Sequence, residues 1–242
     1  MIKIIILAAG KGTRMKSELP KVLNPIKGEP MINYLVKSVK WSGVSERPII
    51  VVSPANKNLI KRALKNFNCC YAVQKNQLGT GHAVSSARRL ATGAERIIVL
   101  YGDHPFLKKE TINKMAVLNK SAISLATVKV KDFKSWRKNF FHWGRIIRKG
   151  GKITAIVEFK DASDREKKIK ELNPALYSFD ALWLWKNLKK LKNENASGEY
   201  YLTDLIKLAF KEGLKIDSFE IDAREAVGIN SREELEAAER LL

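Results

Sequence analysis

The chain has 242 residues, of which 45% are hydrophobic, and it carries a formal net charge of +20. This composition, without a long apolar run, favours a soluble globular protein and excludes a membrane-spanning helix. The charge alone would allow nucleic-acid binding, but the lysines are scattered, and aromatic and basic residues interleave only at Phe133–Arg148. We therefore interpret the charge as a solvated basic surface that also attracts anionic nucleotides, and we expect no nucleic-acid partner.

The N-terminus and the cysteines both indicate a cytoplasmic location. The first residues enter an apolar segment that lacks the small-residue cleavage site of a signal peptide. Cys69 and Cys70 are adjacent, so they cannot form a conventional disulfide framework. A reducing compartment is the natural expectation.

The first apolar segment leads directly into a run of small residues. Ile2 to Leu7 predict a strand that is buried on both faces. Residues 8–12 are mostly alanine and glycine, so a ligand can approach the backbone N–H groups there. Lys11, Arg14 and Lys21 add positive charge nearby. Taken alone, this pattern indicates either a polyphosphate site or an ordinary glycine-rich turn, since it matches neither common phosphate-binding motif.

Strand-like and helix-like segments alternate through the first half of the chain, which is typical of βαβ units and a parallel sheet. In open sheets of this kind, ligands gather at the carboxyl ends of the strands. We therefore expect the loops after Leu7, Val73 and Tyr101 to face one crevice. The periodicity predicts helices near 31–43, 59–67 and 79–90, and strands at 48–52, 70–73 and 97–101.

The second half has a different pattern. Gly150-Gly151 is a hairpin signal between two apolar segments. Ser231 and Glu234 form a predicted capping box for a last helix. The remaining predictions are strands at 123–130, 144–148, 152–159 and 175–179, a charged helix at 161–172, and an amphipathic helix at 199–211.

Two motifs carry a family resemblance. LAAGKGTRM at residues 7–15, followed by LPKVL at 19–23, resembles the signature of the sugar-nucleotide pyrophosphorylases, and QLGTGHA at 77–83 matches their second signature. The resemblance covers essentially the whole chain and is closest to the N-acetylglucosamine-1-phosphate uridyltransferase domain. It implies an α/β fold with a Rossmann-like, mixed but mostly parallel sheet, helices on both faces and a smaller sugar-side lobe. We expect one domain over 1–242, with a nucleotide-binding half (1–120) and a sugar-binding, closing half (121–242).

The resemblance implies an enzyme that transfers UMP from UTP to N-acetylglucosamine 1-phosphate, releasing pyrophosphate. The sugar phosphate attacks the α-phosphorus directly, so no covalent nucleophile is needed. Cations and Mg²⁺ would screen the repulsion between the two anions. The alternatives are the same reaction with glucose 1-phosphate or dTTP, a non-catalytic sugar-nucleotide-binding protein on the same fold, and, more weakly, a nucleic-acid-binding protein.

The residue roles follow from the matching positions. A carboxylate and an amide oxygen suit magnesium, and a glutamine amide suits a uracil edge. A capping role is the alternative for Asp103, and we interpret His104 as a residue that packs beside the metal ligands or supports them. The resemblance implies Lys21, Arg14 and Asp103 as catalytic; Leu7, Ala8, Ala9, Gly10, Lys21, Gln74, Gly79 and Thr80 as nucleotide-binding; Tyr101, Gly102, Gly144, Glu158 and Asn173 as sugar-binding; and Asp103 with Asn230 as metal ligands.

Two departures from the family pattern stand out. Asn173-Pro174-Ala175 replaces the common Asn-Thr-Gly or Asn-Ser-Gly. Pro174 removes a backbone donor and Ala175 adds a Cβ, so we expect a weaker preference for the N-acetylated sugar over glucose 1-phosphate. The bifunctional relatives continue into hexapeptide repeats that carry an acetyltransferase, and these 242 residues contain none. We therefore expect either a free-standing uridyltransferase or an excised domain, without acetyl transfer.

Overall fold

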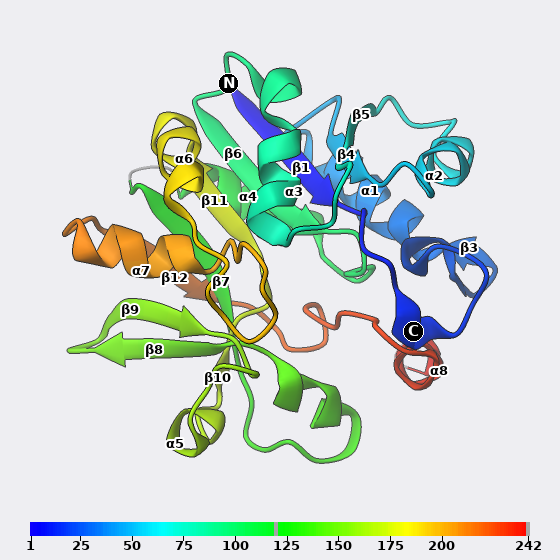
Figure 1. Ribbon diagram of the computed structural model, residues 1–242. Coiled ribbons are helices and arrows are strands. Elements are labelled where there is room, and N and C mark those ends of the chain that lie inside the picture. Colours follow the sequence, from blue (N-terminus) through cyan, green and yellow to red (C-terminus); the bar gives the residue numbers. More distant parts are fainter. Residues whose placement is uncertain (119–120, 241–242) are drawn as a thin grey trace.

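The computed structural model describes residues 1–118 and 121–240, so the predicted boundary of the nucleotide-binding half (residues 119–120) and the last two residues of the predicted domain lie outside it. The strands in this part of the chain are β1 (Ile2–Leu7), β2 (Pro25–Ile26), β3 (Glu29–Pro30), β4 (Ile49–Val52), β5 (Cys70–Val73), β6 (Arg96–Tyr101), β7 (Ile123–Lys129), β8 (Arg145–Lys149), β9 (Lys152–Val157), β10 (Glu171–Leu172), β11 (Tyr177–Asp180) and β12 (Ile216–Glu220). Ten of them form one sheet in the order β5-β4-β1-β6-β11-β7-β10-β8-β9, with β12 paired to β7, and β2 pairs with β3 separately (Figure 1).

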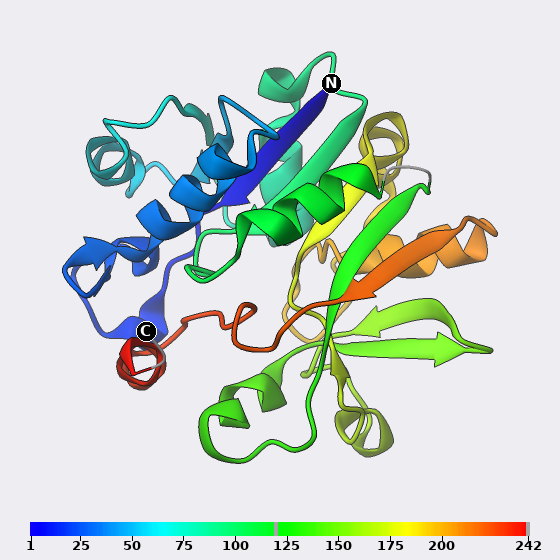
Figure 2. The same ribbon diagram turned by 180° about the vertical axis from the view of Figure 1, so that it is seen from behind.

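Helices cover both faces of the sheet. The α-helices are α1 (Met31–Ser42), α2 (Lys57–Ala63), α3 (Thr80–Ser86), α4 (Lys109–Val117), α5 (Asp164–Lys167), α6 (Ala181–Asn187), α7 (Asp204–Lys211) and α8 (Arg232–Glu239). Short 3-10 helices span Thr13–Met15, Lys21–Leu23, Arg88–Ala91, Ser135–His142 and Leu188–Lys190. Figures 1 and 2 show α3, α6 and α7 on one face, and α1 and α4 on the other. None of the helices in the described ranges combines the length and apolar character needed to cross a membrane.

The first half of the sheet is parallel, as predicted. Leu7 of β1 pairs with Val51 of β4 and with Tyr101 of β6, and β4 pairs in turn with β5. The carboxyl ends of these strands therefore lie at one edge. The chain runs outward from β1 through β4 to β5 and then returns to the other side of β1. This reversal is the topological switch point at which α/β sheets bind ligands.

The second half of the sheet is largely antiparallel. β11 runs antiparallel between β6 and β7, and β8 and β9 form the predicted hairpin. Gly150 and Gly151 have φ values of 56° and 76°. A type I′ turn, which is common in two-residue hairpins, requires positive φ at both positions. The predicted mixed α/β class is confirmed. The first half of the chain supplies parallel strands, and the second half supplies mainly antiparallel strands.

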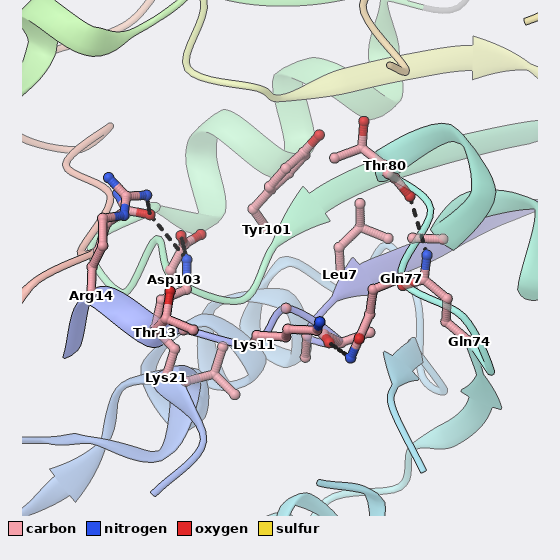
Figure 3. A pocket seen from close by; sticks show the side chains of 18 of the residues that line it. Leu7, Lys11, Thr13, Arg14, Lys21, Gln74, Gln77, Thr80, Tyr101 and Asp103 are labelled. Carbon is pink, nitrogen blue, oxygen red and sulfur yellow. Dashed lines mark hydrogen bonds and ion pairs between the residues drawn. The ribbon is translucent and has the colours of Figure 1, made fainter. Parts of the chain in front are cut away.

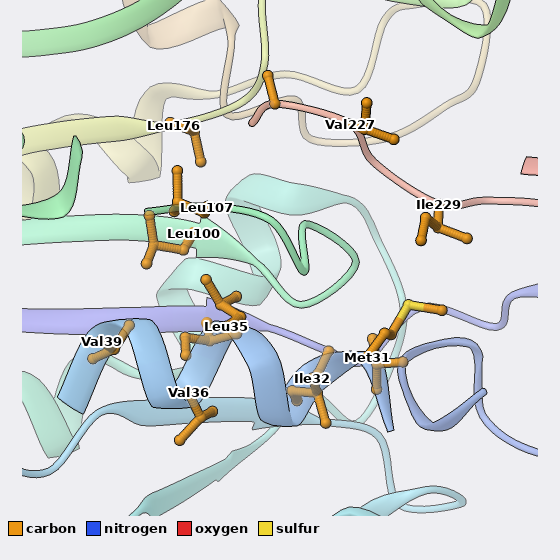
Figure 4. Close-up of a cluster of buried hydrophobic side chains, with 14 of the residues drawn as sticks. Met31, Ile32, Leu35, Val36, Val39, Leu100, Leu107, Leu176, Val227 and Ile229 are labelled. Carbon is orange, nitrogen blue, oxygen red and sulfur yellow. The ribbon is translucent and has the colours of Figure 1, made fainter. Parts of the chain in front are cut away.

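The apolar side of α1 anchors more than the first βαβ unit. Leu35 and Val36 share one buried cluster with Ile4 and Ile6 of β1, because alternate side chains of a strand face the same helix layer. Ile229, which precedes the predicted metal ligand near the end of the chain, lies in the same cluster and is 0% exposed (Figure 4). Burying each such side chain contributes about 1.5–3 kcal/mol, so this core fixes the C-terminal segment against the first half.

Two of the predicted helices in the second half are wrong in extent. The charged segment 161–172 forms only the short helix α5, and Leu172 instead joins the sheet, where it is 0% exposed. The amphipathic helix predicted from residue 199 begins at Asp204. The residues before it are extended because the backbone of Tyr200 hydrogen-bonds to Leu78 and Gly81. In both cases, tertiary contacts outweigh the helical pattern.

Smaller differences concern helix ends. The helix predicted for 59–67 stops at Ala63, and the helix predicted for 79–90 is interrupted after Ser86. Ser231 caps α8 by accepting from the Glu234 N–H, but the Glu234 carboxylate accepts from Asn230 N at 2.6 Å rather than closing the predicted box. No sequence-based prediction covered α4, α6 and β12.

Candidate active site

The loop after β1 presents free backbone donors. Ala8 N still donates to Val51 O of the sheet at 2.8 Å, but the N–H groups of residues 9–12 have no acceptor within the described chain. Gly12 has φ of +63°, and a Cβ there would lie 2.6 Å from Lys21 Cβ. Glycine therefore lets this loop close onto Lys21 while its N–H groups stay available for an anion.

Four polar side chains meet at the end of this loop. The Lys21 ammonium forms an ion pair with the Asp103 carboxylate, and it donates to Asn230 Oδ1 at 3.0 Å. The Arg14 guanidinium reaches the same Asn230 oxygen at 3.3 Å (Figure 3). The main-chain oxygen of Asp103 also accepts from Ile229 N, which locks the segment before Asn230 to the end of β6. Asp103 and Asn230 thus both contact the Lys21 ammonium, although they lie far from it in the sequence.

The charge state of Asp103 follows from this arrangement. Burial of the carboxyl by itself raises its pKa, but the Lys21 ammonium next to it more than offsets that effect, so the pKa of Asp103 lies below its usual value. Asp103 is therefore ionised at neutral pH and is available as an anionic oxygen ligand.

The other end of the loop faces a second set of signature residues. Gln77 Nε2 donates to Ala9 O at 2.9 Å, which ties the loop after β5 to the loop after β1. Gly79 has φ of +107°, and a Cβ there would lie 2.7 Å from the backbone of Tyr200. Thr80 Oγ1 accepts from Leu202 N at 2.9 Å. Only glycine permits this close passage between the two halves of the chain.

Two adjacent cavities lie along these loops, with volumes of about 440 Å³ and about 320 Å³. The first runs from the loop after β1 to Gln74, and the second runs between Asn230 and Glu158. Both are lined by a common wall that consists of Arg14, Thr80, Tyr101, Asp103, Glu199 and Asn230. Ligands in the two cavities would meet at this wall, beside the cluster of Lys21.

A half-buried carboxylate defines the second cavity. Glu158 Oε1 accepts from Thr203 Oγ1 at 3.1 Å, and a Cβ at Gly144 would lie 3.4 Å from Glu158 Oε2. Burial raises the pKa of Glu158, and the neighbouring carboxylates of Asp161, Asp204 and Glu199 raise it further, whereas the Thr203 hydrogen bond lowers it. The cavity therefore holds a partly desolvated carboxylate that can accept hydrogen bonds from hydroxyl groups.

We expect Glu158→Gln to raise the melting temperature at pH 7 while it weakens binding in the second cavity. An acid whose folded pKa is raised costs stability as the pH rises from the unfolded pKa through the folded pKa, and the amide removes this cost. The gain should vanish below about pH 4, where the carboxyl is protonated in both states. Melting curves from about pH 3 to pH 8 measure it, and a lower melting temperature at pH 7 would contradict the raised pKa of Glu158.

The Asn173 segment forms another wall of the second cavity. Asn173 is 6% exposed; its Oδ1 accepts from Ala175 N at 3.0 Å, and its Nδ2 donates to the Tyr177 hydroxyl at 2.6 Å. Ala175 has φ of +58°, a left-handed conformation that glycine adopts without cost. Alanine therefore takes the backbone shape of a glycine here, with strain of about 1–2 kcal/mol.

We expect Ala175→Gly to stabilise the protein by roughly 0.5–1 kcal/mol, because relief of strain exceeds the added freedom of the unfolded chain. This corresponds to a rise of about 1–4 °C in melting temperature. Ala155→Gly, in the middle of β9, is the matched control and should instead destabilise, since its backbone is an ordinary strand. Equal losses in both variants would show that Ala175 carries no strain.

A buried arginine holds part of the wall of the second cavity in place. Arg145 begins β8 and is 0% exposed, and no carboxylate of the described residues pairs with it. Its guanidinium donates to the main-chain oxygens of Phe141, Trp143 and Lys167. Three rings surround it, with centroids at 5.2, 5.7 and 5.6 Å: those of Phe133, Phe141 and Phe159. The interleaved aromatic and basic residues of this segment therefore form an internal cluster.

The structure brings most of the predicted site residues to these cavities. The first contains the predicted nucleotide-binding residues, and the second contains Gly144, Glu158 and Asn173, while Tyr101 lines both. Gly102 is the exception, because it lies behind the wall with its N–H on Leu7 O. The family pattern marked residues 197–204 as a segment that shapes the pocket, and Glu199 and Thr203 of that segment line the second cavity. Sequence reasoning missed His142 and Trp143, which only tertiary contacts bring to this cavity, and Arg145, which holds Trp143 from outside it. His104 is buried as expected, although its Nδ1 has no partner in the described chain.

The donor set fits a single divalent cation rather than a closed metal site. No cluster of three or more histidine, cysteine, aspartate or glutamate side chains suited to a metal occurs among residues 1–118 and 121–240. Asp103 and Asn230 instead direct one oxygen each at the Lys21 ammonium. Two oxygen ligands that converge on a cation match the way in which Mg²⁺ binds, since it keeps waters and takes further oxygens from phosphates.

Comparisons with known proteins agree with this geometry. A profile of the MobA-like NTP transferase domain matches residues 4–180. The chain is 38% identical over 240 residues to the bifunctional protein GlmU of Clostridium novyi, and 40% identical over 239 residues to that of Acinetobacter baumannii. Each match covers 98% of this chain and 51% of the relative, so the chain spans about half the length of the curated relatives it matches.

A solved structure shares the fold. A Bacillus anthracis protein named as a glucose-1-phosphate thymidylyltransferase, in complex with sucrose, superposes with a TM-score of 0.78 at 22% identity, covering 100% of this chain and 95% of that one. Together with the family match, these findings make the chain a nucleotidyltransferase. It belongs to the family of the MobA-like NTP transferase domain, and the family recognition made from the two sequence motifs is confirmed.

Proposed function

We propose that this chain transfers UMP from UTP to N-acetylglucosamine 1-phosphate, giving UDP-N-acetylglucosamine and pyrophosphate. The observation that carries the proposal is the wall shared by the two cavities, with Arg14, Asp103 and Asn230 in it and Lys21 against it. A transfer between two phosphates needs two anions side by side among cations, and this wall offers that arrangement.

The first cavity would hold the nucleotide. Its free loop N–H groups and the side chains of Lys11, Arg14 and Lys21 would bind the triphosphate, and Gln74 with the backbone of Gly79 would bind the base. The second cavity would hold the sugar, with Glu158 and Asn173 as hydrogen-bonding partners for its polar groups. The two substrates would then place the sugar phosphate next to the α-phosphate.

The reaction needs no residue that is covalently modified. An ionised oxygen of the sugar phosphate forms a bond to the α-phosphorus, and the bond from that phosphorus to the oxygen of the β-phosphate breaks, so pyrophosphate leaves with the electron pair. Lys21 and Arg14 stabilise the charge that develops on the phosphate oxygens. Asp103 orients the Lys21 ammonium through their ion pair.

Asp103 and Asn230 would hold Mg²⁺, which supplies neutralisation of phosphate charge when it is bound. The same two side chains hold Lys21 in this structure, so the cation and the lysine draw on one set of oxygens. This sharing accounts for the proximity of the predicted metal ligands to the predicted catalytic lysine.

A second candidate keeps the reaction and changes the sugar. The Asn173 amide is engaged by Ala175 N and the Tyr177 hydroxyl, which leaves it fewer free bonds for an acetamido group. Glucose 1-phosphate is therefore a competing acceptor, and thymidine triphosphate is a competing donor because thymine shares the hydrogen-bonding edge of uracil.

A screen of pyrophosphate release decides between these substrates. UTP, dTTP, CTP and ATP are each combined with N-acetylglucosamine 1-phosphate and with glucose 1-phosphate, in the presence of magnesium. We expect the highest kcat/KM for UTP with N-acetylglucosamine 1-phosphate, with only a modest advantage over glucose 1-phosphate. A higher value for glucose 1-phosphate would overturn the sugar assignment, and binding without release for every pair would favour a non-catalytic sugar-nucleotide-binding protein.

A further inference from the structure

The side-chain amide of Gln74 is held in one orientation by the start of α3. Gln74 follows β5 at the inner end of the first cavity and is 3% exposed. Its Nε2 lies 3.1 Å from the main-chain oxygen of Gly79 and 3.0 Å from Nδ1 of His82. Figure 3 shows the amide nitrogen turned toward the segment that leads to Thr80.

These two contacts use both hydrogens of the amide. A main-chain oxygen can only accept, so the atom facing Gly79 must be the nitrogen of the amide. The second hydrogen is directed at His82 Nδ1, which accepts it when the imidazole carries its proton on Nε2. Gln74 Oε1 has no hydrogen-bond partner among the described residues, so it remains the polar atom that this side chain offers to the cavity.

The opposite orientation of the amide is unfavourable because it would place Oε1 against the Gly79 oxygen, where two acceptors repel. With its proton on Nε2, His82 adds to this preference, because Nδ1 then accepts from the amide nitrogen and would repel Oε1.

The locked amide distinguishes between pyrimidine bases. Gly79 lines the same cavity as Gln74, and its N–H has no acceptor within the described chain, so the cavity presents both an acceptor and a donor. Uracil and thymine carry N3–H beside a carbonyl oxygen and fit this pair. Cytosine has an unprotonated N3, which would face Oε1 acceptor to acceptor, and a buried pair of this kind is costly.

We propose that His82 is a positioning residue for base selection: it holds the Gln74 amide with Oε1 toward the cavity, so that the site accepts bases with an N3–H and rejects cytosine. The inference rests on the proposed function, because it assumes that the nucleotide binds in the first cavity. His82 itself does not touch the base, and it acts through the amide of Gln74.

The experiment compares nucleotide binding to the wild type and to three variants. Dissociation constants for UTP and CTP are measured by titration calorimetry without sugar phosphate, and melting curves verify that each variant is folded. His82→Phe keeps a ring but removes the acceptor, whereas His82→Asn can place an amide oxygen where Nδ1 lies. Ser86→Ala is the matched control, because Ser86 donates to the His82 main-chain oxygen one turn along the same helix and does not contact Gln74.

We expect the ratio of the CTP to the UTP dissociation constant to fall by about threefold to tenfold in His82→Phe, the value of one neutral hydrogen bond. The ratio should recover in His82→Asn and stay at the wild-type value in Ser86→Ala. A structural role of His82 would weaken the binding of both nucleotides alike without changing the ratio.

An unchanged ratio in folded His82→Phe would overturn the inference and leave the proposed function intact. A wild type that binds UTP and CTP equally, or binds neither, would overturn it as well. Selective UTP binding that His82→Phe abolishes, in a protein that releases no pyrophosphate with any sugar phosphate, would instead support the inference and overturn the proposed function.

Discussion

Replacing Asp103 with asparagine should lower kcat by about 100-fold to 1000-fold, the range that follows the loss of one preorganised electrostatic group. The substitution keeps the shape of the side chain but removes its negative charge. It thereby weakens the hold on Lys21 and on any divalent cation bound beside Asn230. We expect half-maximal activity to require a higher magnesium concentration, and a titration of rate against magnesium measures both effects.

The fold should tolerate Asp103→Asn. The Lys21 side chain is 19% exposed and faces the first cavity, so water can solvate its ammonium when the carboxylate is gone. Lys21→Met and the double variant complete a mutant cycle. Because the two side chains contact each other, we expect the double variant to lose little more than either single one. Wild-type kcat in Asp103→Asn at saturating magnesium would contradict the role given to Asp103.

The largest effect on stability should come from Arg145→Ala, with a loss of about 3–5 kcal/mol. The substitution removes the donor of several buried main-chain oxygens and leaves a cavity among three aromatic rings. In a chain of this size, the melting temperature should fall by about 6–20 °C. Thermal or urea denaturation measures the loss.

Arg148→Ala is the matched control for the buried arginine. Arg148 lies on the same strand, is exposed, and pairs with Glu171 at 2.7 Å, so its loss should cost about 0–1 kcal/mol. Arg145→Lys should be intermediate, because lysine keeps the charge but not the planar fork of donors. A loss at Arg145 no larger than at Arg148 would contradict the supporting role of the buried cluster.

The conservative substitution Arg145→Lys should affect substrate binding in the two cavities unequally. Arg145 holds Trp143 and its neighbours, which line the second cavity, and it makes no contact with the loop after β1. In Arg145→Lys, the KM for the sugar phosphate should therefore rise while the KM for the nucleotide stays near its wild-type value.

The parallel half of the fold could be predicted because its strands are mostly apolar and are followed by small or polar residues. Ile2–Leu7 and the strand before Gly102 have no plausible surface position, so their pairing and the crevice at their ends follow from burial alone. Gln74 and Asp103 could be predicted because they lie at the carboxyl ends of β5 and β6, where side chains enter the crevice, whereas Lys21 could be predicted only from its place in the family motif.

The second half was harder to predict because its segments are short and charged, and their structure depends on distant partners. Leu172 becomes a strand residue because it fits between Val128 and Arg145. Residues 199–202 stay extended because they pass close to Gly79. Arg145 resembles one more surface cation on a very basic chain, and nothing local shows that aromatic residues from three segments enclose it.

The central claim is that the shared wall transfers a nucleotide directly from a triphosphate to a sugar phosphate. Phosphorus NMR of UTP mixed with N-acetylglucosamine 1-phosphate, magnesium and the purified chain tests it in one measurement. We predict that UDP-N-acetylglucosamine and pyrophosphate appear together in equal amounts, and only when the sugar phosphate is present. Release of UMP, or no change in the UTP signals while both ligands are bound, would contradict the account.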